Sequence, residues 1–249
     1  MPIKKNYVVV YFPVFRKERE VEMNTKTPIQ AMVFDFDGTL ADTRSSIIQC
    51  LWELLNHFNI PIPPHFSLES LFTRTFDEVL QSIPGVEMDQ IPELVDYHNH
   101  RYSEIARRKA QLFPGVLKTL SVLSHSSLSL AIATNENREI LDELIAGFNI
   151  ESFFHLTVCH DEVLRPKPFP DMAKRIMREF DVPSEKTLVI GDSVLDIEMG
   201  KRARCQTCAV TYGAQSKRRL KSRSPRWMVG NFTEIVNFLD PAREYEAFG

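Results

Sequence analysis

The sequence predicts an α/β fold: a doubly wound, mostly parallel sheet of the Rossmann-like kind, with a helical cap domain inserted after its first strand. Short apolar runs alternate with stretches of helical periodicity, which is typical of βαβ units. The 249 residues, 43% hydrophobic and 25% charged, are enough for one large core. The first predicted strand ends near Asp35 and the next begins at Leu128. One crossover helix needs far fewer residues than this, so the segment between the two strands is predicted to contain an inserted domain.

Six apolar runs bounded by turn residues are the predicted strands. They are Ala31–Phe34, Leu128–Ala133, Phe154–Cys159, Thr187–Ile190, Thr207–Val210 and Trp227–Val229. Two stripes with helical spacing, at residues 140–148 and 172–180, predict helices that pack on the sheet. We expect the core to comprise residues 29–42 and 113–240, followed by a tail at 241–249.

Residues 43–112 carry the helical pattern that predicts the inserted cap. One apolar face runs from Ile47 to Phe58, Thr75 and Glu78 form a capping box ahead of a second helix, and a third helix opens at Pro92. The sequence Phe113-Pro114-Gly115 closes the insertion.

Residues 1–28 are an N-terminal extension for which we expect an extra strand or hairpin. Two lysines followed by the apolar run Tyr7–Phe15 resemble the start of a signal peptide, but no small-residue cleavage site follows. An alternative is that Met23 is the physiological start.

Composition excludes several kinds of protein. A net charge of −3 gives no overall field to attract nucleic acid or an anionic membrane. Four irregularly spaced cysteines do not make a disulfide framework, so we expect a cytoplasmic protein. Only 9 glycines are present, and no glycine-rich phosphate loop is found. A bound phosphate would therefore have to be held by other groups than such a loop.

The most informative local feature is the sequence Asp35-Phe36-Asp37-Gly38 directly after the first strand. It places two carboxylates at the carboxyl end of a parallel strand, where open α/β sheets bind ligands, and the glycine lets the backbone turn at once. Carboxylates so close repel each other, and a divalent cation relieves that repulsion. The alternative is a solvated Asp-Gly turn.

Three later strand ends carry groups suited to phosphoryl transfer. Thr134 and Asn135 offer a hydroxyl and an amide to phosphate oxygens, although such a threonine also commonly caps a helix. Lys167 lies between prolines that stiffen its backbone, although a lone loop lysine is usually only solvated. Asp192 ends the next buried strand, and Asp196 follows about one helical turn later.

In this order the four motifs resemble those of the haloacid dehalogenase-like hydrolase superfamily. They are Asp-x-Asp-Gly-Thr, Ala-Thr-Asn, a proline-flanked lysine and Gly-Asp-x-x-x-Asp, and the resemblance covers roughly residues 29–240. It is closest to the phosphatases with a helical cap after the first motif. Within these, residues 97–106 and the run from Leu112 to Val116 look most like the phosphoglycolate phosphatase branch.

The resemblance implies Mg²⁺-dependent hydrolysis of a small phosphate monoester through an aspartyl-phosphate intermediate. Asp35 would be the nucleophile, and Asp37 would protonate the leaving alcohol and then activate water. Mg²⁺ would be held by Asp35, the backbone carbonyl of Asp37, and Asp192. Asp196 would support the waters of the metal or Lys167. The transferring phosphate oxygens would be bound by the amides near Gly38 and by Thr134, Asn135 and Lys167.

The same residues argue for or against other activities. Asp37 argues against a dehalogenase, which has no leaving alcohol to protonate, and the absence of lysine from residues 43–100 argues against a phosphonate-cleaving enzyme. A sugar-phosphate mutase of the beta-phosphoglucomutase type stays an alternative because it shares core and cap. A binding or regulatory protein that retains the site is a further alternative, suggested by residues 1–28 and the basic cluster at 217–226.

The cap is expected to choose the substrate, a small phosphorylated metabolite. The candidates are Arg44, Arg74, His98, His100 and Arg101, each of which also fits a solvated helix face or a satisfied histidine. We expect a monomer or homodimer with no membrane contact and no nucleic-acid partner. Cys205 and Cys208 lack the second pair that a zinc site needs and are predicted to be small core residues. The basic cluster is predicted to be a solvated surface, with nucleic-acid contact as the alternative.

Overall fold

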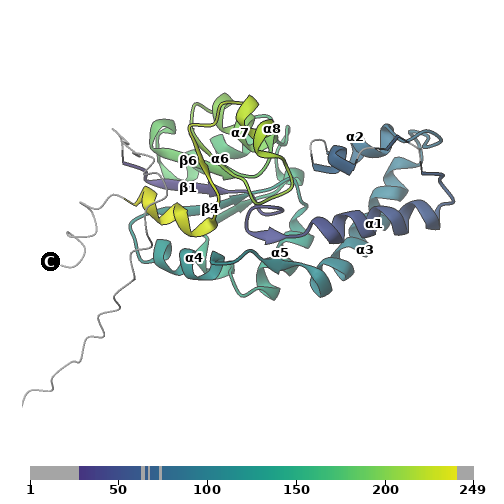
Figure 1. The fold of residues 1–249 in the computed structure, drawn as a ribbon, viewed down its shortest axis with the longest axis horizontal. Coiled ribbons are helices and arrows are strands. Elements are labelled where there is room, and N and C mark those ends of the chain that lie inside the picture. The colour runs from purple at the N-terminus through teal and green to yellow at the C-terminus, as the bar shows by residue number, and fades with distance from the viewer. Residues whose placement is uncertain (1–27, 63–64, 67, 73–74, 240–249) are drawn as a thin grey trace, which may run out of the picture.

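The computed structural model describes residues 28–62, 65–66, 68–72 and 75–239 (Figure 1). The strand or hairpin expected for the N-terminal extension, the tail and the cap candidate Arg74 fall outside these residues. Among the helices that the structure describes, none has both the length and the apolar character needed to cross a membrane.

The core is a six-stranded parallel sheet with the strand order β5-β4-β1-β6-β7-β8. Its strands are β1 (Ala31–Phe34), β4 (Ser129–Ala133), β5 (Leu156–Val158), β6 (Thr187–Gly191), β7 (Gln206–Val210) and β8 (Trp227–Val229). All six predicted strands are present. The chain adds β4 and β5 on one side of β1 and then returns to build β6, β7 and β8 on the other. Such a reversal leaves a crevice at the carboxyl ends of the central strands.

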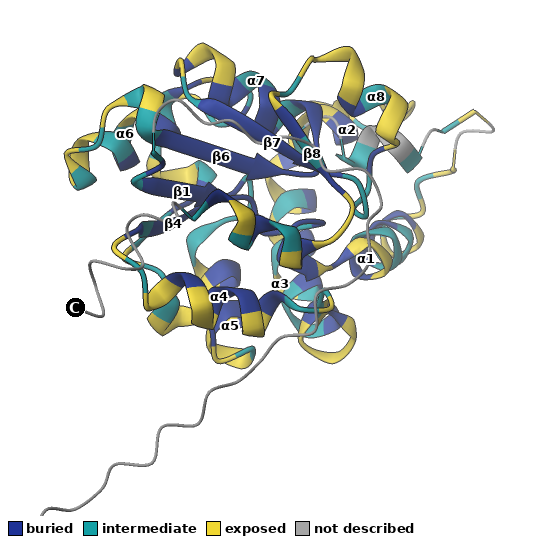
Figure 2. Cartoon of the chain, turned by 60° about the vertical axis from the view of Figure 1, so that its left-hand side comes forward, coloured by how far each residue is buried: buried dark blue, intermediate teal, exposed yellow. Residues whose placement is uncertain are grey.

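Helices cover both faces of this sheet, which confirms the predicted doubly wound α/β fold (Figures 1 and 2). The flanking helices are α4 (Val116–Ser124), α5 (Arg138–Gly147), α6 (Asp171–Phe180), α7 (Val194–Arg202) and α8 (Lys217–Ser222), with short 3-10 helices at Glu151–Phe153, His160–Glu162, Ser184–Lys186 and Phe232–Phe238.

Alternation along β1 assigns its side chains to the two faces. Met32 and Phe34 pack with residues of α4, α5 and the helix at 232–238, whereas Val33 packs with residues of α6 and α7. Every residue of β1 is buried, as expected for a central parallel strand that is covered on both sides.

The predicted helical insertion forms a separate lobe, at the right of Figure 1. It contains α1 (Arg44–His57), the 3-10 helix η1 (Leu68–Phe72), α2 (Phe76–Gln81) and α3 (Ile91–Lys109). The lobe has its own apolar cluster, formed by side chains such as Leu51, Leu80 and Leu94. The capping box of Thr75 and Glu78 at the start of α2 is present as predicted.

Two very short strands mark the points where the chain enters and leaves the lobe. β2 (Ala41–Asp42) and β3 (Gln111–Leu112) pair antiparallel, and the backbone amide of Phe113 donates to the carbonyl of Leu40. This pair was not predicted, because two residues are too few to show a strand periodicity.

Neither the cysteine pair nor any residue of the basic cluster lines the two cavities at the crevice. Cys208 is buried in β7, Cys205 is half-buried beside Met177, and burial raises the pKa of the Cys205 thiol to about 12. Thiols in such surroundings are unreactive. α8 exposes most of its basic side chains while its Leu220 is buried, and Arg223, just beyond, pairs with Glu198 at 2.8 Å.

Candidate active site

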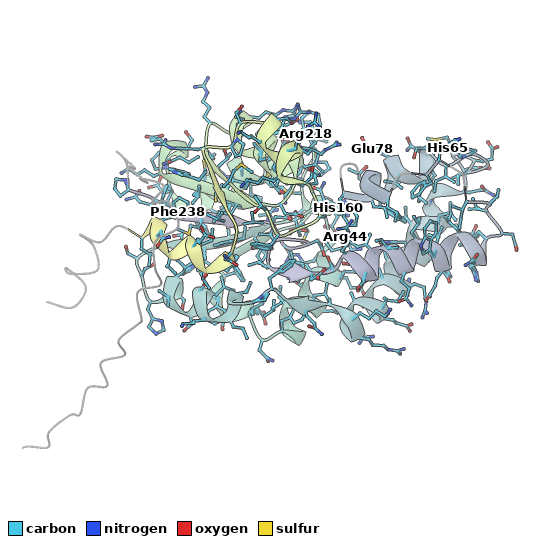
Figure 3. The ribbon with its side chains drawn as sticks, in the orientation of Figure 1. Arg44, His65, Glu78, His160, Arg218 and Phe238 are labelled. Carbon is cyan, nitrogen blue, oxygen red and sulfur yellow. The ribbon has the colours of Figure 1, made fainter. Side chains whose placement is uncertain are left out.

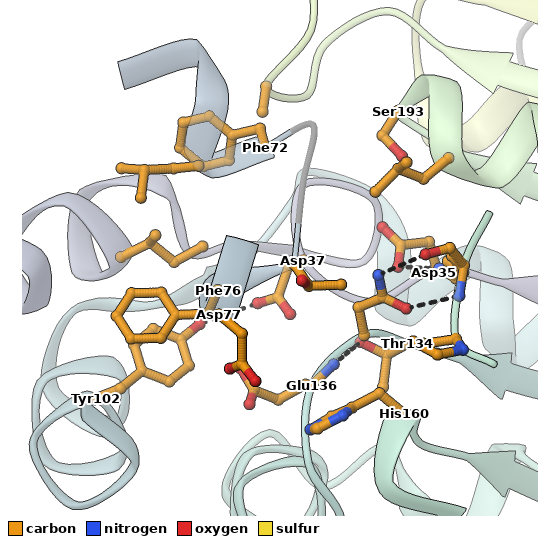
Figure 4. Close-up of a pocket in the computed structure, with 18 of the residues that line it drawn as sticks. Asp35, Asp37, Phe72, Phe76, Asp77, Tyr102, Thr134, Glu136, His160 and Ser193 are labelled. Carbon is orange, nitrogen blue, oxygen red and sulfur yellow. Dashed lines mark hydrogen bonds and ion pairs between the residues drawn. The ribbon is translucent and has the colours of Figure 1, made fainter. Parts of the chain in front are cut away.

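Three neighbouring strands bring polar side chains to the crevice at the carboxyl edge of the sheet. Asp35 follows β1, Thr134 follows β4 and Asp192 follows β6, while Lys167 comes from the loop before α6. All four line a cavity of about 370 Å³ between the sheet and the helical lobe (Figure 4). The parallel topology explains this meeting, because it places the ends of all three strands on one edge.

Lys167 joins two carboxylates that are far apart in the sequence. Its ammonium lies 2.5 Å from Oδ1 of Asp35 and 2.6 Å from Oδ1 of Asp196, and its side chain is 3% exposed. These two partners offset the cost of burying the lysine and hold its pKa above the usual range. The lysine is therefore charged and fixed beside Asp35.

Asp196 has a second task at the start of α7. Its Oδ2 accepts a 2.6 Å hydrogen bond from the hydroxyl of Ser193 and a 3.0 Å bond from the Ser193 backbone amide, which completes a capping box. One oxygen of Asp196 thus fixes the helix while the other pairs with Lys167. This places Asp196 against Lys167, one of the two roles that the resemblance implied for it.

Asp192 is enclosed by backbone. Its Oδ2 accepts a hydrogen bond of 2.5 Å from the amide of Ala214, and a Cβ atom added at Gly38 or Gly213 would lie 2.3 Å from the same oxygen. Gly38 also has a φ of +82°, a conformation that side chains rarely adopt. Burial, together with the charge of Asp196, raises the pKa of Asp192 to about 7.

The acidic cluster has the composition of a divalent-cation site. Among the described residues, Asp35, Asp192 and Asp196 form one group of metal-ligating side chains, with oxygen atoms within 4.8 Å of one another. Burial and mutual repulsion raise the pKa values of Asp35 and Asp192, and a bound cation would relieve both effects. Carboxylate oxygens are the ligands that Mg²⁺ prefers, so these residues fit the ion.

Asp37 is held from the helical lobe. The hydroxyl of Tyr102, in α3, donates to Oδ1 of Asp37 at 3.0 Å. Tyr102 is fully buried and stacks on His98 at 5.4 Å between ring centroids, and His98 in turn packs on Phe76 at 3.7 Å. Burial raises the pKa of Asp37, so its carboxyl group holds a proton more readily than a free aspartate.

Glu136 is a site residue that was not predicted from the sequence. It follows the Thr134-Asn135 motif, and its side chain lines the same cavity as Asp37 (Figure 4). Desolvation and the nearby charge of Asp37 raise its pKa well above the usual value. Its position directly after a strand-end motif was the available signal, since side chains at such ends face the crevice.

The phosphate-binding candidates are distributed unevenly. Thr134 is buried at the cavity wall, where its hydroxyl accepts from the backbone amide of Glu136 at 3.0 Å. The amide group of Asn135 donates to the carbonyl of Lys167 at 3.3 Å and accepts from its backbone amide at 3.1 Å. In this structure Asn135 therefore positions the loop of Lys167, and its contact with phosphate stays a prediction.

The four described cap candidates do not gather in one place. Of them only His98 lines the main cavity, and burial lowers its pKa to about 4, which leaves it neutral near pH 7. Arg101 pairs with Glu53, and His100 is exposed beside Asp96. Arg44 lies at the junction of lobe and core and lines a neighbouring cavity of about 120 Å³ (Figure 3).

Comparison with known proteins places this geometry in a family. A family model described as haloacid dehalogenase-like hydrolase matches residues 32–210. "Probable phosphatase IndB" of Dickeya dadantii is 28% identical over 211 residues, which cover 82% of this chain and 91% of that protein. "Pyrophosphatase PpaX" of Oceanobacillus iheyensis is 27% identical over 214 residues, covering 85% of this chain and 97% of that protein.

The solved structures show that the fold is shared. One is titled a predicted phosphoglycolate phosphatase from Haemophilus somnus; it superposes with a TM-score of 0.77 at 21% identity and covers 85% of this chain and 98% of that one. The family model spans most of the sequence, including the strand ends that carry Asp35, Thr134, Lys167 and Asp192. The chain therefore belongs to the haloacid dehalogenase-like hydrolase family, and its predicted class as a hydrolase is confirmed.

Proposed function

We propose that the protein is a Mg²⁺-dependent phosphatase that hydrolyses a small-molecule phosphate monoester, in the manner of the phosphoglycolate phosphatase-like branch. The observation that carries the proposal is the pairing of two unequal aspartates at one cavity: Asp35, beside a buried lysine, and Asp37, held two residues later by a tyrosine of the lobe. One carboxylate is placed to attack and the other to exchange a proton.

Each residue of the site has its own role in the proposed reaction. Asp35 attacks phosphorus in line and forms an aspartyl-phosphate, while Asp37 gives its proton to the departing alcohol oxygen. Asp37 then takes a proton from the water that attacks the aspartyl-phosphate, which releases inorganic phosphate and restores Asp35. Lys167 and Thr134 hold the transferring oxygens, since both lie at the cavity wall beside Asp35.

Asp35 and Asp192, with Asp196 adjacent, are the residues that would hold Mg²⁺. The ion supplies positive charge that offsets the repulsion between an anionic nucleophile and a dianionic phosphate group. The remaining expectations, a small phosphorylated metabolite as substrate and a monomer or homodimer in the cytoplasm, stay proposals.

A panel of phosphate monoesters, assayed for phosphate release with Mg²⁺ and with EDTA, tests the function. We expect turnover of at least one ester with Mg²⁺ and loss of that turnover in EDTA, restored by added metal. Metal-independent turnover would contradict the Mg²⁺ requirement. Conversion of one sugar phosphate into an isomer with little phosphate release would favour the mutase alternative.

Mg²⁺ is expected to stabilise the fold more at about pH 8 than at about pH 5.5. The raised pKa of Asp192, about 7, means that the folded metal-free protein binds this proton more tightly than the unfolded chain, so stability falls as pH rises toward 7. Mg²⁺ competes with the proton. At a concentration about 100 times its Kd, the ion should raise the unfolding midpoint by roughly 5–10 °C at the higher pH.

Thermal unfolding followed by circular dichroism measures this shift. The Asp192→Asn variant is the control and should lose both the shift and its pH dependence. An equal shift in the variant, or an equal shift at both pH values, would show that the ion acts elsewhere.

Tyr102→Phe is expected to lower kcat roughly 10- to 100-fold, the loss associated with one hydrogen bond to a charged group. The hydroxyl of Tyr102 lowers the pKa of Asp37, so its removal should move the basic limb of the kcat–pH profile to higher pH. Tyr97→Phe is a matched control in the same helix, since Tyr97 does not line the cavity. An unchanged profile in Tyr102→Phe would contradict the assigned role.

A further inference from the structure

The part of the cavity that lies beyond Asp35 and Asp37 has an apolar wall supplied by the helical lobe. Leu71 and Phe72 come from η1, Phe76 from α2 and Val95 from α3. Figure 4 shows Phe72 and Phe76 on the side of the cavity opposite Asp35 and Thr134. A leaving group attached to phosphorus at Asp35 has to extend toward this wall.

Acidic side chains border the same space. Asp77, on the exposed first turn of α2, and Glu136, after β4, line the cavity together with Asp37. Figure 4 labels Asp77 and Glu136 below Asp37 in the view. Additional negative charge is therefore unfavourable in this region.

Few positively charged side chains lie there among the residues that the structure describes. Lys167 is the one lysine or arginine among the described residues that line the cavity, and it already pairs with Asp35 and Asp196. His98 is neutral near pH 7, because burial lowers its pKa to about 4. The guanidinium of Arg44 lies 5.6 Å from the ring centre of Phe72 and lines the neighbouring cavity.

We infer that the preferred substrate is a phosphate monoester whose leaving alcohol carries no further negative charge and presents an apolar or aromatic face to Phe72 and Phe76. A positively charged or hydrogen-donating group on that alcohol would find acceptors in Asp77 and Glu136. The inference rests on the proposed function and restricts its substrates to esters of this kind. Substrates with a second anionic group close to the phosphate, such as phosphoglycolate or pyrophosphate, are expected to be poor.

Two esters that differ only by a distant carboxylate test this inference. Benzyl phosphate and 4-carboxybenzyl phosphate have similar leaving alcohols, so a difference in kcat/KM reports the response of the cavity to charge. We expect kcat/KM for benzyl phosphate to be higher by about 10-fold or more, and phosphoglycolate to be turned over more slowly still. Equal or better turnover of the carboxylated ester overturns the inference.

Binding separates a failure of this inference from a failure of the proposed function. Benzylphosphonate and 4-carboxybenzylphosphonate resist hydrolysis, and titration calorimetry with Mg²⁺ gives their affinities whether or not the protein turns over esters. Weaker binding of the carboxylated compound by about 10-fold supports the inference. Equal or tighter binding overturns it. Absence of turnover with every ester counts against the phosphatase function alone.

Two charge-reversal variants test whether the discrimination against the carboxylated ester arises at the cavity. Asp77→Lys should raise the ratio of kcat/KM for the carboxylated ester over the unsubstituted one by roughly 10-fold, since it places a cation at the cavity wall. Glu93→Lys makes the same change in net charge on the first turn of α3, where Glu93 is exposed and does not line the cavity. It should leave the ratio unchanged; the same rise in both variants would overturn the assignment to the cavity.

A double variant tests whether Arg44 or Arg74 supplies a positive charge to the substrate. The double variant Arg44→Ala, Arg74→Ala should keep the discrimination against the carboxylated ester. If the wild-type protein instead prefers that ester and the double variant loses the preference, an arginine supplies the missing cation and the inference is wrong.

Discussion

Asp35→Asn is expected to lower kcat by about 10⁴-fold or more, because an amide cannot replace the carboxylate that attacks phosphorus. The fold should survive the change. Asparagine has nearly the shape of aspartate, and Lys167 keeps its second partner, Asp196, at 2.6 Å. The loss would therefore be one of chemistry and not of structure.

Steady-state phosphate release and thermal unfolding, measured on the same preparations, check this expectation. Asp89→Asn is the control, since Asp89 is exposed and lies outside the cavity. Its activity should equal that of the wild-type protein. If Asp35→Asn keeps more than about a tenth of the wild-type kcat, Asp35 is not the nucleophile.

Lys167→Met is expected to reduce stability as well as activity. Its removal leaves Asp35 and Asp196 without their cation, and breaking a buried ion pair from one side costs about 3–5 kcal/mol. For a domain of this size, that corresponds to a fall in the unfolding midpoint of roughly 6–20 °C in metal-free buffer. Turnover should fall too, because the transferring phosphate oxygens lose a fixed positive charge.

A second substitution distinguishes the charge effect from a loss of packing. Adding Asp35→Asn to Lys167→Met removes one of the two stranded carboxylates, so the double variant should unfold at a higher temperature than Lys167→Met alone. Lys174→Met, on the exposed side of α6, controls for the general effect of replacing a lysine. A double variant less stable than the single one would mean that the ion-pair network is not what Lys167 stabilises.

The fold was largely predictable because its signals are local. Each strand of the central sheet is a short apolar run with turn residues at its ends, and a parallel strand buried on both sides requires that composition. The capping box of Thr75 and Glu78 could be predicted for the same reason, since both partners lie within four residues. The strand pair β2–β3 was not, because its two residues per strand carry no periodicity of their own.

The candidate site was predictable in part. The strand-end motifs name residues that the topology must bring to one edge, so the convergence of Asp35, Thr134 and Asp192 follows from the order of the elements. Tyr102 could not be identified in this way, because on its helix it has the spacing of an ordinary core residue. Its hydroxyl meets Asp37 across 65 positions of sequence, a pairing that depends on how the lobe packs on the core.

The apolar wall of the cavity was the least predictable part. Arg101 was a reasonable candidate for contacting a substrate, but its guanidinium is occupied by Glu53, from the neighbouring helix of the lobe. Phe72 and Phe76 border the cavity instead. Which side of a small helical lobe faces the core is decided by packing between helices, and composition alone does not reveal it.

The hydrogen bonds and ion pairs at the site link distant parts of the chain, and this has a consequence for protein synthesis. Lys167 meets Asp35 across 132 positions, and the amide that holds Asp192 belongs to Ala214. A growing chain makes Asp35 early, yet its contact with Lys167 waits for residue 167 and the contact that holds Asp192 waits for residue 214. Unfinished or prematurely terminated chains therefore carry Asp35, the proposed nucleophile, without the groups that orient it, so the proposed activity requires a nearly complete chain.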